Sequence, residues 1–230
     1  MGRAPTPLEI QALLLSLRVA AVAVAVALPA GVCVAWILAR FEFPGKTLVD
    51  GIVHLPMVVP PVAVGYGLLL VLGRSGPLGG LLERAGITLA FDWKGAAVAA
   101  AVMGFPLLVR SVRLSMESVD RGLESAARTL GARPARVFFT VTLPLVTPGI
   151  LTGIILAFAR SLGEFGATIT FVSNIPGETR TLPLAIYGFT QTPGGEIGAL
   201  RLCVIAVAVS LAALVISEVA SRRLAARMGG

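Results

Sequence analysis

The chain has 230 residues, of which 56% are hydrophobic and only 13% are charged, with a mean hydropathy of +0.90. Soluble domains carry about 25% charged residues, so this composition excludes an ordinary soluble protein and indicates an integral membrane protein. The net charge of +7 does not require a nucleic acid partner, because Lys and Arg gather on the cytoplasmic side of membrane proteins. Each spanning helix needs about 20 apolar residues, so residues 1–230 suit a single transmembrane domain with about five or six spans.

Five apolar segments follow one another along the chain. Four of them are plain candidates for spans, at residues 12–39, 51–73, 95–109 and 197–219. The first is too long for a signal peptide and has no cleavage site, so it is predicted to be a retained span. The fifth segment, 137–172, is too long for one span and contains Pro144, Pro148 and several glycines. It predicts an interfacial lead-in, a span and a broken or re-entrant piece, and five spans are favoured over six.

The basic residues predict the orientation. With the N-terminus outside, eleven of the 19 Lys and Arg fall on the cytoplasmic side: Arg40, Lys46, Arg110, Arg113, Arg121, Arg128, Arg133, Arg136, Arg222, Arg223 and Arg227. The outer side keeps Arg3, Arg18, Arg74, Arg84, Lys94, Arg180 and Arg201, and Arg160 lies at depth. This bias places residues 114–136 and the C-terminus in the cytoplasm.

A compact helix is predicted at residues 120–131, within this cytoplasmic stretch. Asp120 suits its N-cap, Gly131 suits the left-handed position after its last turn, and Pro134 prevents continuation. An apolar stripe consists of Val119, Leu123, Ala126, Ala127 and Leu130. A helix this short is marginal alone in water, so the stripe needs a surface to lie on. The same pattern also fits a solvated helix that only connects two spans.

Two pairs of opposite charges are spaced for ion pairs on this helix. Glu117 precedes Arg121 by four residues, and Glu124 precedes Arg128 by four. This order is the favourable one on a helix surface. Both are therefore expected to be solvent-exposed pairs.

The loop around this helix resembles the EAA loop of ABC-importer permeases. That family has E-A-A, three residues, G, nine residues and I-x-L-P, and the chain matches with Ala126-Ala127, Gly131 and Val141-x-Leu143-Pro144. Ser125 stands where the family has its Glu, and Glu124 comes one position earlier. The resemblance implies a coupling helix, in a loop at residues 115–140, that sits in a cleft of an ATPase subunit. The coupling residues it implies are Glu124, Ser125, Ala126, Ala127, Arg128, Gly131, Leu143 and Pro144.

A second stretch, FARSLGEFGATITFVSNIPGETRTLPLAIYGFTQTPGGE at residues 158–196, resembles the permeases of molybdate importers, with sulfate and tungstate permeases as close relatives. The resemblance implies an all-α, type I ABC-importer bundle of five or six spans in the cell inner membrane. It further implies a homodimer that moves an oxyanion, molybdate first, by alternating access. Its partners would be ATPase subunits, which bind the ATP, and an extracytoplasmic oxyanion-binding protein; the chain itself would need no cofactor.

The chain offers no convincing catalytic set of its own. The sequence FPGKT at residues 43–47 ends like a phosphate-binding loop, but Arg40 occupies the position of the first glycine. His54 is the sole histidine, and the sequence shows no cysteine, second histidine or carboxylate to work with it. Cys33 and Cys203 lie in apolar runs and are expected to be buried thiols rather than a disulfide or a metal site. The chain is therefore predicted not to be an enzyme.

Interrupted helices are the expected walls of a translocation pathway, since irregular backbone at depth is tolerated where it lines a cavity or is buried in protein. The stretches 54–67, with Pro60 and Pro61, and 143–149 are the candidates, and kinking for packing alone is the alternative. Arg160 and Glu164 are four residues apart and predict an ion pair near the pathway or gate, with direct substrate contact by Arg160 as the alternative. Ser161 and Thr168 are candidate hydroxyl donors along the pathway.

The segment from Asn174 to Glu196 falls on the outer side in this topology. Pro-Gly pairs at 176–177 and 193–194 predict turns, with a short helix at 182–189 between them. The segment is placed either to contact a substrate-delivering protein or to cap the bundle. Two rival classes stay open for the whole chain, a stand-alone secondary transporter or channel and an intramembrane enzyme.

Overall fold

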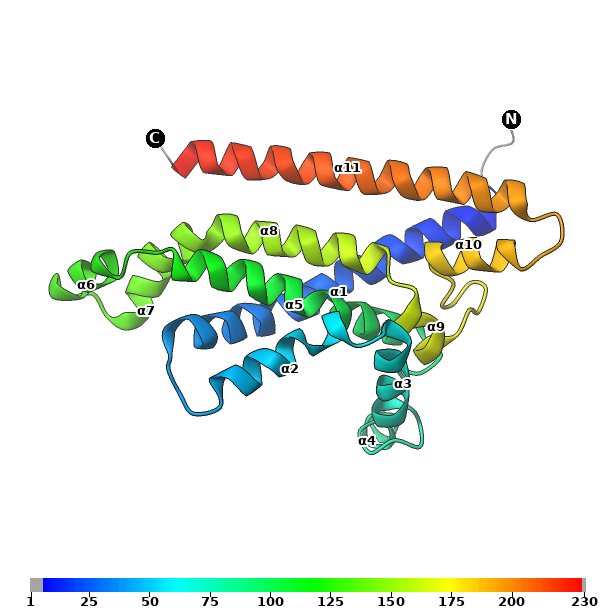
Figure 1. The fold of residues 1–230 in the computed structure, drawn as a ribbon, viewed down its shortest axis with the longest axis horizontal. Helices are drawn as coiled ribbons and strands as arrows, with labels where there is room; N and C mark the ends of the chain where they lie inside the picture. The colour runs from blue at the N-terminus through cyan, green and yellow to red at the C-terminus, as the bar shows by residue number, and fades with distance from the viewer. Residues whose placement is uncertain (1–5, 229–230) are drawn as a thin grey trace.

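The computed structural model describes residues 6–228, and the side chains of all of these except 214, 216–218 and 220–228. Arg3 and the side chains of Arg222, Arg223 and Arg227, which contribute to the charge bias, lie outside the described residues. Every described element is a helix (Figure 1). In chain order these are α1 Pro7–Arg40, α2 Lys46–Val58, α3 Pro61–Leu72, α4 Gly79–Arg84, α5 Trp93–Glu117, α6 Arg121–Thr129, α7 Pro134–Val137, the π-helix η1 Phe138–Thr142, α8 Leu143–Leu162, α9 Gly166–Val172, α10 Leu182–Thr190 and α11 Glu196–Met228.

Five segments of the described chain can cross a membrane. Four are long apolar helices: α1, α5, the run 134–162 that ends with α8, and the first part of α11 up to residue 213. The fifth is the pair α2 and α3, which together are apolar enough but are bent by 114° at a short break. The described residues thus give four spans, or the predicted five if the bent pair α2–α3 crosses the membrane as one span, and they offer no sixth.

The helices run so that the two termini lie at opposite ends of the bundle (Figure 1). α1 begins beside α10 and ends at the end of the bundle where α6 lies, and α11 returns from α10 toward that same end. The end that carries α6 therefore also holds the C-terminus, which agrees with the predicted orientation.

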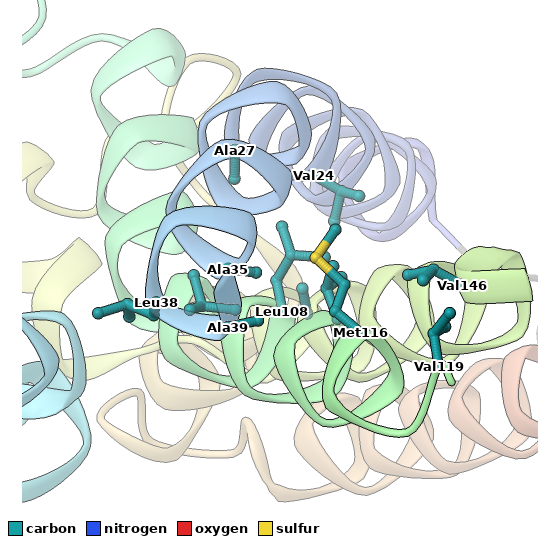
Figure 2. Close-up of a cluster of buried hydrophobic side chains, with 12 residues drawn as sticks. Val24, Ala27, Ala35, Leu38, Ala39, Leu108, Met116, Val119 and Val146 are labelled. Carbon is teal, nitrogen blue, oxygen red and sulfur yellow. The ribbon is translucent and has the colours of Figure 1, made fainter. Parts of the chain in front are cut away.

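Three spans form the main hydrophobic core. Side chains of α1, α5 and α8 pack together in one cluster, which includes Leu38, Leu108 and Val146, each fully buried (Figure 2). Small residues allow the close approach that packing between membrane helices requires. A Cβ added at Gly104 of α5 would lie 3.2 Å from the carbonyl oxygen of Ala157 on α8. α1, α5 and α8 therefore form one tightly packed unit.

The two predicted interruptions behave differently. The run 54–67 is broken at Val59–Pro60, as expected from proline, which cannot donate the next helical hydrogen bond. The stretch 143–149 is not broken: Pro144 lies in the first turn of α8, and Pro148 is accommodated inside that helix. The irregularity lies instead one turn earlier, where η1 adopts π-helical hydrogen bonding. Interruption of the backbone at 143–149 is therefore a wrong prediction, while the break after α8, at Gly163, is confirmed.

Both cysteines are free, and neither is buried. Cys33 on α1 and Cys203 on α11 are exposed on the surface of the single chain. The prediction of buried thiols is wrong because an apolar run that crosses a membrane presents part of its residues to lipid or to another subunit rather than to its own core.

Candidate coupling and translocation sites

The predicted cytoplasmic helix is present with both of its ends. Asp120 is the N-cap of α6, and its side chain accepts a hydrogen bond of 2.8 Å from the backbone N–H of Gly122. Gly131 follows the helix with φ +84°, in the left-handed region. Its N–H bonds the carbonyl of Arg128, and the N–H of Ala132 bonds the carbonyl of Ala127. This is the Schellman arrangement, and it ends α6 sharply before α7 begins at Pro134.

α6 turns its polar face toward its own chain and its apolar stripe away. Arg121, Glu124, Ser125 and Arg128 line an open cavity of about 550 Å³, whose other walls come from the end of α1, from α7 and from η1. On the opposite face, Leu123 is 51% exposed and Leu130 is 89% exposed. α6 has no buried residue. Leu123 and Leu130 of the apolar stripe are thus uncovered by this chain, whereas Val119, just before α6, is 8% exposed and packs in the main core.

Glu124 makes the main polar link between α6 and the rest of the molecule. Its Oε1 accepts a hydrogen bond of 2.6 Å from Arg40 Nη2, at the end of α1, and one of 2.7 Å from Thr142 Oγ1, at the end of η1. The predicted exposed pair with Arg128 is therefore wrong. The reason is tertiary: Arg40 and Glu124 are 11% and 13% exposed, and a charge withdrawn from water gains more from a close partner than an exposed one does.

The other predicted surface pair is also wrong. Glu117 bonds Arg113, one turn back on α5, at 2.8 Å, and not Arg121. Arg113 also bonds Asp50 of α2 at 2.8 Å, so this pairing joins two spans.

The remaining residues assigned to coupling lie along the same loop. Ala126 is exposed and Ala127 is half-buried on α6, and the Ser125 hydroxyl donates to the carbonyl of Arg121 within the helix. Leu143 and Pro144 begin α8 directly after η1. The loop therefore runs from the capped helix through a π-helical turn into a span.

The two helix breaks lie side by side. Pro60 caps α3 and Pro61 begins it, while Gly166 begins α9 after the break that follows α8. A Cβ added at Gly166 would lie 2.8 Å from Pro61 Cβ, and one at Gly65 would lie 2.8 Å from Ala167 Cα. Segments about 100 residues apart in the sequence are thus in backbone contact where neither helix continues.

An ion pair closes the break between α8 and α9. Arg160 Nη1 lies 2.6 Å from Glu164 Oε2, and the other carboxylate oxygen accepts a hydrogen bond of 2.8 Å from the N–H of Ala167. Glu164 is 2% exposed, and the Arg160 side chain is 30% exposed. The predicted ion pair is confirmed, and Glu164 also caps the first turn of α9.

The two predicted hydroxyl donors are covered. Ser161 is 5% exposed, and its hydroxyl donates at 3.4 Å to the carbonyl of Ala100 on α5. Thr168 on α9 is 1% exposed. In the single chain both hydroxyls lie inside the packing rather than on an open surface.

The outer end of the bundle holds the predicted turns and short helix. Gly177 and Gly194 have φ +81° and +77°, as the two Pro-Gly turns require, and α10 lies between them at Leu182–Thr190. The backbone N–H of Leu182 donates to Ser16 Oγ at 2.6 Å, which fastens α10 to α1. Arg180 bonds Asn174 within the loop before α10.

Sequence reasoning missed a cluster of polar contacts on α2. His54 Nδ1 lies 2.9 Å from the carbonyl oxygen of Asp50 and 3.3 Å from its carboxylate, and that carboxylate also bonds Arg113. The expectation that His54 has no nearby carboxylate is therefore wrong. The spacing of four residues between Asp50 and His54 is the signal that could have revealed it.

A buried pair at the outer end was also missed. Glu9 of α1 is 2% exposed and is bonded by Arg201 of α11, across most of the sequence. The pair joins the starts of two spans. Its members are too far apart in sequence for any local pattern to reveal them.

The two remaining candidates for chemistry are the FPGKT stretch and a metal site. Lys46 of FPGKT bonds Glu42 at 2.7 Å, and this hydrogen bond and the Lys46 charge lower the pKa of Glu42 below its usual range. Among the described residues, no group of three or more His, Cys, Asp or Glu side chains could hold a metal ion.

Comparison with known proteins gives a consistent assignment. The family of binding-protein-dependent transport system inner membrane components matches residues 27–229. The molybdenum transport system permease protein ModB of Escherichia coli K12 is 62% identical over 211 residues, covering 91% of this chain and 92% of that protein. The ModB of Haemophilus influenzae is 54% identical over 96% of this chain and 97% of its own length. The sulfate permease CysW of Synechococcus elongatus is 40% identical over 68% of this chain and 54% of that protein.

The solved structures agree on the fold. A bacterial ABC transporter for the import of alginate matches with a TM-score of 0.76 and 17% identity, covering 95% of this chain and 80% of that one. The bundle of α1–α11 thus has the fold of an ABC-importer permease. The chain belongs to the family of binding-protein-dependent transport system inner membrane components, which are transport components of the membrane.

Proposed function

We propose that the chain is the permease subunit of an ATP-driven importer that carries molybdate into the cell by alternating access. The observation that supports molybdate as the substrate is the 62% identity to a molybdenum permease over nearly the full length of both proteins. A sulfate permease is similar at 40%, but over only about half of its own length, so sulfate is the second candidate. Tungstate, which shares the charge and tetrahedral shape of molybdate, is tested beside it.

An outside source of energy is needed for this transport. A divalent anion that enters against a negative-inside potential costs about 2.3 kcal/mol per charge for each 100 mV. A coupling-ion mechanism would need a carboxylate free to exchange protons or ions at depth, and Glu164 is instead held by Arg160 and by the N–H of Ala167. ATP hydrolysis by a partner subunit is the proposed source.

The proposed docking point of the ATPase is the exposed stripe of α6. Leu123 and Leu130 are large apolar side chains on a helix that this chain leaves uncovered. The side-chain cap at Asp120 and the Schellman end at Gly131 keep the helix short and fixed in direction. A short, rigid helix with an uncovered apolar face is suited to a cleft in a partner.

A second copy of the permease is proposed to face α2 and α3. In the single chain α2 has no buried residue, and next to its break Met57 is 49% exposed and Val58 is 83% exposed. Lipid cannot satisfy the backbone polar groups that a helix break frees, so a break at membrane depth must be covered by protein or must line a water-filled space. A homodimer with the pathway between the two α2–α3 segments meets both conditions.

The extracytoplasmic binding protein is proposed to dock on the outer loops around α10. These loops are held by specific bonds, of Arg180 to Asn174 and of Leu182 to Ser16, and therefore offer a fixed surface. Selectivity would be shared with that protein, because a permease that bound the anion tightly could not release it.

Reconstitution tests the proposal. The purified permease, its ATPase and its binding protein are assembled in proteoliposomes, and uptake of labelled molybdate is measured with and without ATP, with excess sulfate or tungstate as competitor. We expect ATP-dependent molybdate uptake that sulfate does not suppress. Uptake that needs no ATPase would refute the importer, and suppression of molybdate uptake by the excess sulfate would favour the sulfate permease.

A further inference from the structure

The coupling helix is held to the spans by very few contacts, and one carboxylate oxygen provides the most direct of them. α6 has no buried residue, and its main packing contacts are with α7 and η1, which are themselves short. Glu124 Oε1 is bonded by Arg40 at 2.6 Å and by Thr142 at 2.7 Å. Arg40 is the last residue of α1, and Thr142 is the last residue before α8. One atom of α6 therefore contacts the cytoplasmic ends of two spans.

The environment of this contact makes it strong. Arg40 and Glu124 are 11% and 13% exposed, and Thr142 is 3% exposed. Hydrogen bonds between ionised groups are about twice as strong as neutral ones, and they are weakened less by solvent when the groups are withdrawn from water. The position also matters: one residue along the helix is a rotation of about 100°, so a carboxylate at Ser125 would point elsewhere on α6.

The spans that receive the contact are packed together. α1 and α8 belong, with α5, to the single packed cluster that contains Leu38, Leu108 and Val146. A packed core transmits displacement rather than absorbing it. A push on α6 that is passed to the ends of α1 and α8 would therefore displace this unit as a whole.

We infer that Arg40, Glu124 and Thr142 form a positioning link that transmits the movement of α6 to the α1–α5–α8 unit. In this role Glu124 contacts residues of the permease itself and does not contact the ATPase. The inference rests on the proposed function, because it requires an ATPase that acts on α6. It predicts that loss of the link leaves the ATPase bound and active while less substrate moves for each ATP that is hydrolysed.

The experiment uses the reconstituted complex and measures two quantities, molybdate taken up per ATP hydrolysed and the amount of ATPase that co-purifies with the permease. The variants are Arg40→Gln, Glu124→Gln, the nearly isosteric Thr142→Val and the exchanged pair Arg40→Glu with Glu124→Arg. Arg110→Gln is the matched control, since Arg110 is an exposed arginine on α5 at the same end of the bundle.

We expect each single charge variant to lower uptake per ATP about five- to thirtyfold, as the loss of about one to two kcal/mol of interaction allows, with normal ATPase binding. Thr142→Val should give a smaller loss, Thr142→Ser should behave as the wild type, and the exchanged pair should recover much of the ratio. Arg110→Gln should have no effect.

Two results would overturn the inference. The first is a wild-type ratio in Thr142→Val and both single charge variants. The second is loss of ATPase binding in Glu124→Gln without rescue in the exchanged pair, which would place Glu124 on the ATPase surface. Failure of the wild-type complex itself to take up molybdate with ATP would instead refute the proposed function, and the inference with it.

Discussion

The ion pair between Arg160 and Glu164 gives a prediction whose size follows from the structure. Arg160→Met would leave the Glu164 carboxylate 2% exposed, with one donor remaining, the N–H of Ala167. Breaking a buried pair from one side costs about 3–5 kcal/mol, and since Arg160 is 30% exposed we expect the lower end, about 3 kcal/mol. Glu164→Gln removes the buried charge and leaves an arginine that can reach solvent, at a cost of about 1–2 kcal/mol.

The double variant Arg160→Met with Glu164→Gln should then be no less stable than Arg160→Met alone. The two changes should fall short of additivity by about 2 kcal/mol, as expected for residues in direct contact. The assay is reversible unfolding of the purified permease in bicelles, with the free energy of unfolding measured for all four members of the cycle. Additive costs would show that the pair contributes nothing, and a double variant less stable than either single would show that the two residues act through other partners.

Three further variants test the coupling helix and the crossing of the two breaks. Gly131→Val forces a β-branched residue to φ +84° and should cost about 1–2 kcal/mol of folding free energy. We expect normal amounts of this variant in the membrane but ATP hydrolysis uncoupled from uptake, with Gly131→Asn close to wild type. Normal uptake by the valine variant would count against the role of the helix. Gly65→Ala places a Cβ 2.8 Å from Ala167 Cα, whereas Gly67→Ala meets nothing within 4 Å. The first should lose about 1–3 kcal/mol and most of its uptake and the second neither, so equal effects in both would refute the contact. Asp120→Ala should cost about 1 kcal/mol and weaken ATPase co-purification, with Asp120→Asn as the control that keeps the cap.

Local chemistry made much of the fold predictable. Asp120 and Gly131 predict the two ends of α6, and the consecutive prolines Pro60 and Pro61 predict the break between α2 and α3. The pairing of Arg160 with Glu164 was predictable because the two residues are only four positions apart in the sequence, although Glu164 lies just beyond the end of α8. In each of these cases the cause and its effect lie within a few residues.

The choice between ion-pair partners was not predictable in the same way. Glu124 lies four residues before Arg128 but bonds Arg40, 84 positions away. The reason is that the end of α1 places the Arg40 guanidinium beside Glu124, where it is withdrawn from water. Glu9 likewise meets Arg201 only because the fold brings the start of α11 to the start of α1. A helical repeat can show which charges could meet, but burial, set by the packing of the spans, decides which of them do.

The position of α8 joins the two sites. At 1.5 Å per residue, its 20 residues span about 30 Å, the thickness of the apolar part of a membrane. Its cytoplasmic end follows Thr142, which bonds Glu124, and its far end carries Arg160, which holds Glu164 and through it the start of α9. Since α9 contacts α3 at the neighbouring helix break, a displacement of α8 would reach the candidate pathway through the Arg160–Glu164 contact at residues 163–165. The two polar contacts at the ends of one well-packed helix therefore provide a physical connection between the coupling helix and the breaks, and variants at either end should alter uptake per ATP rather than ATP binding.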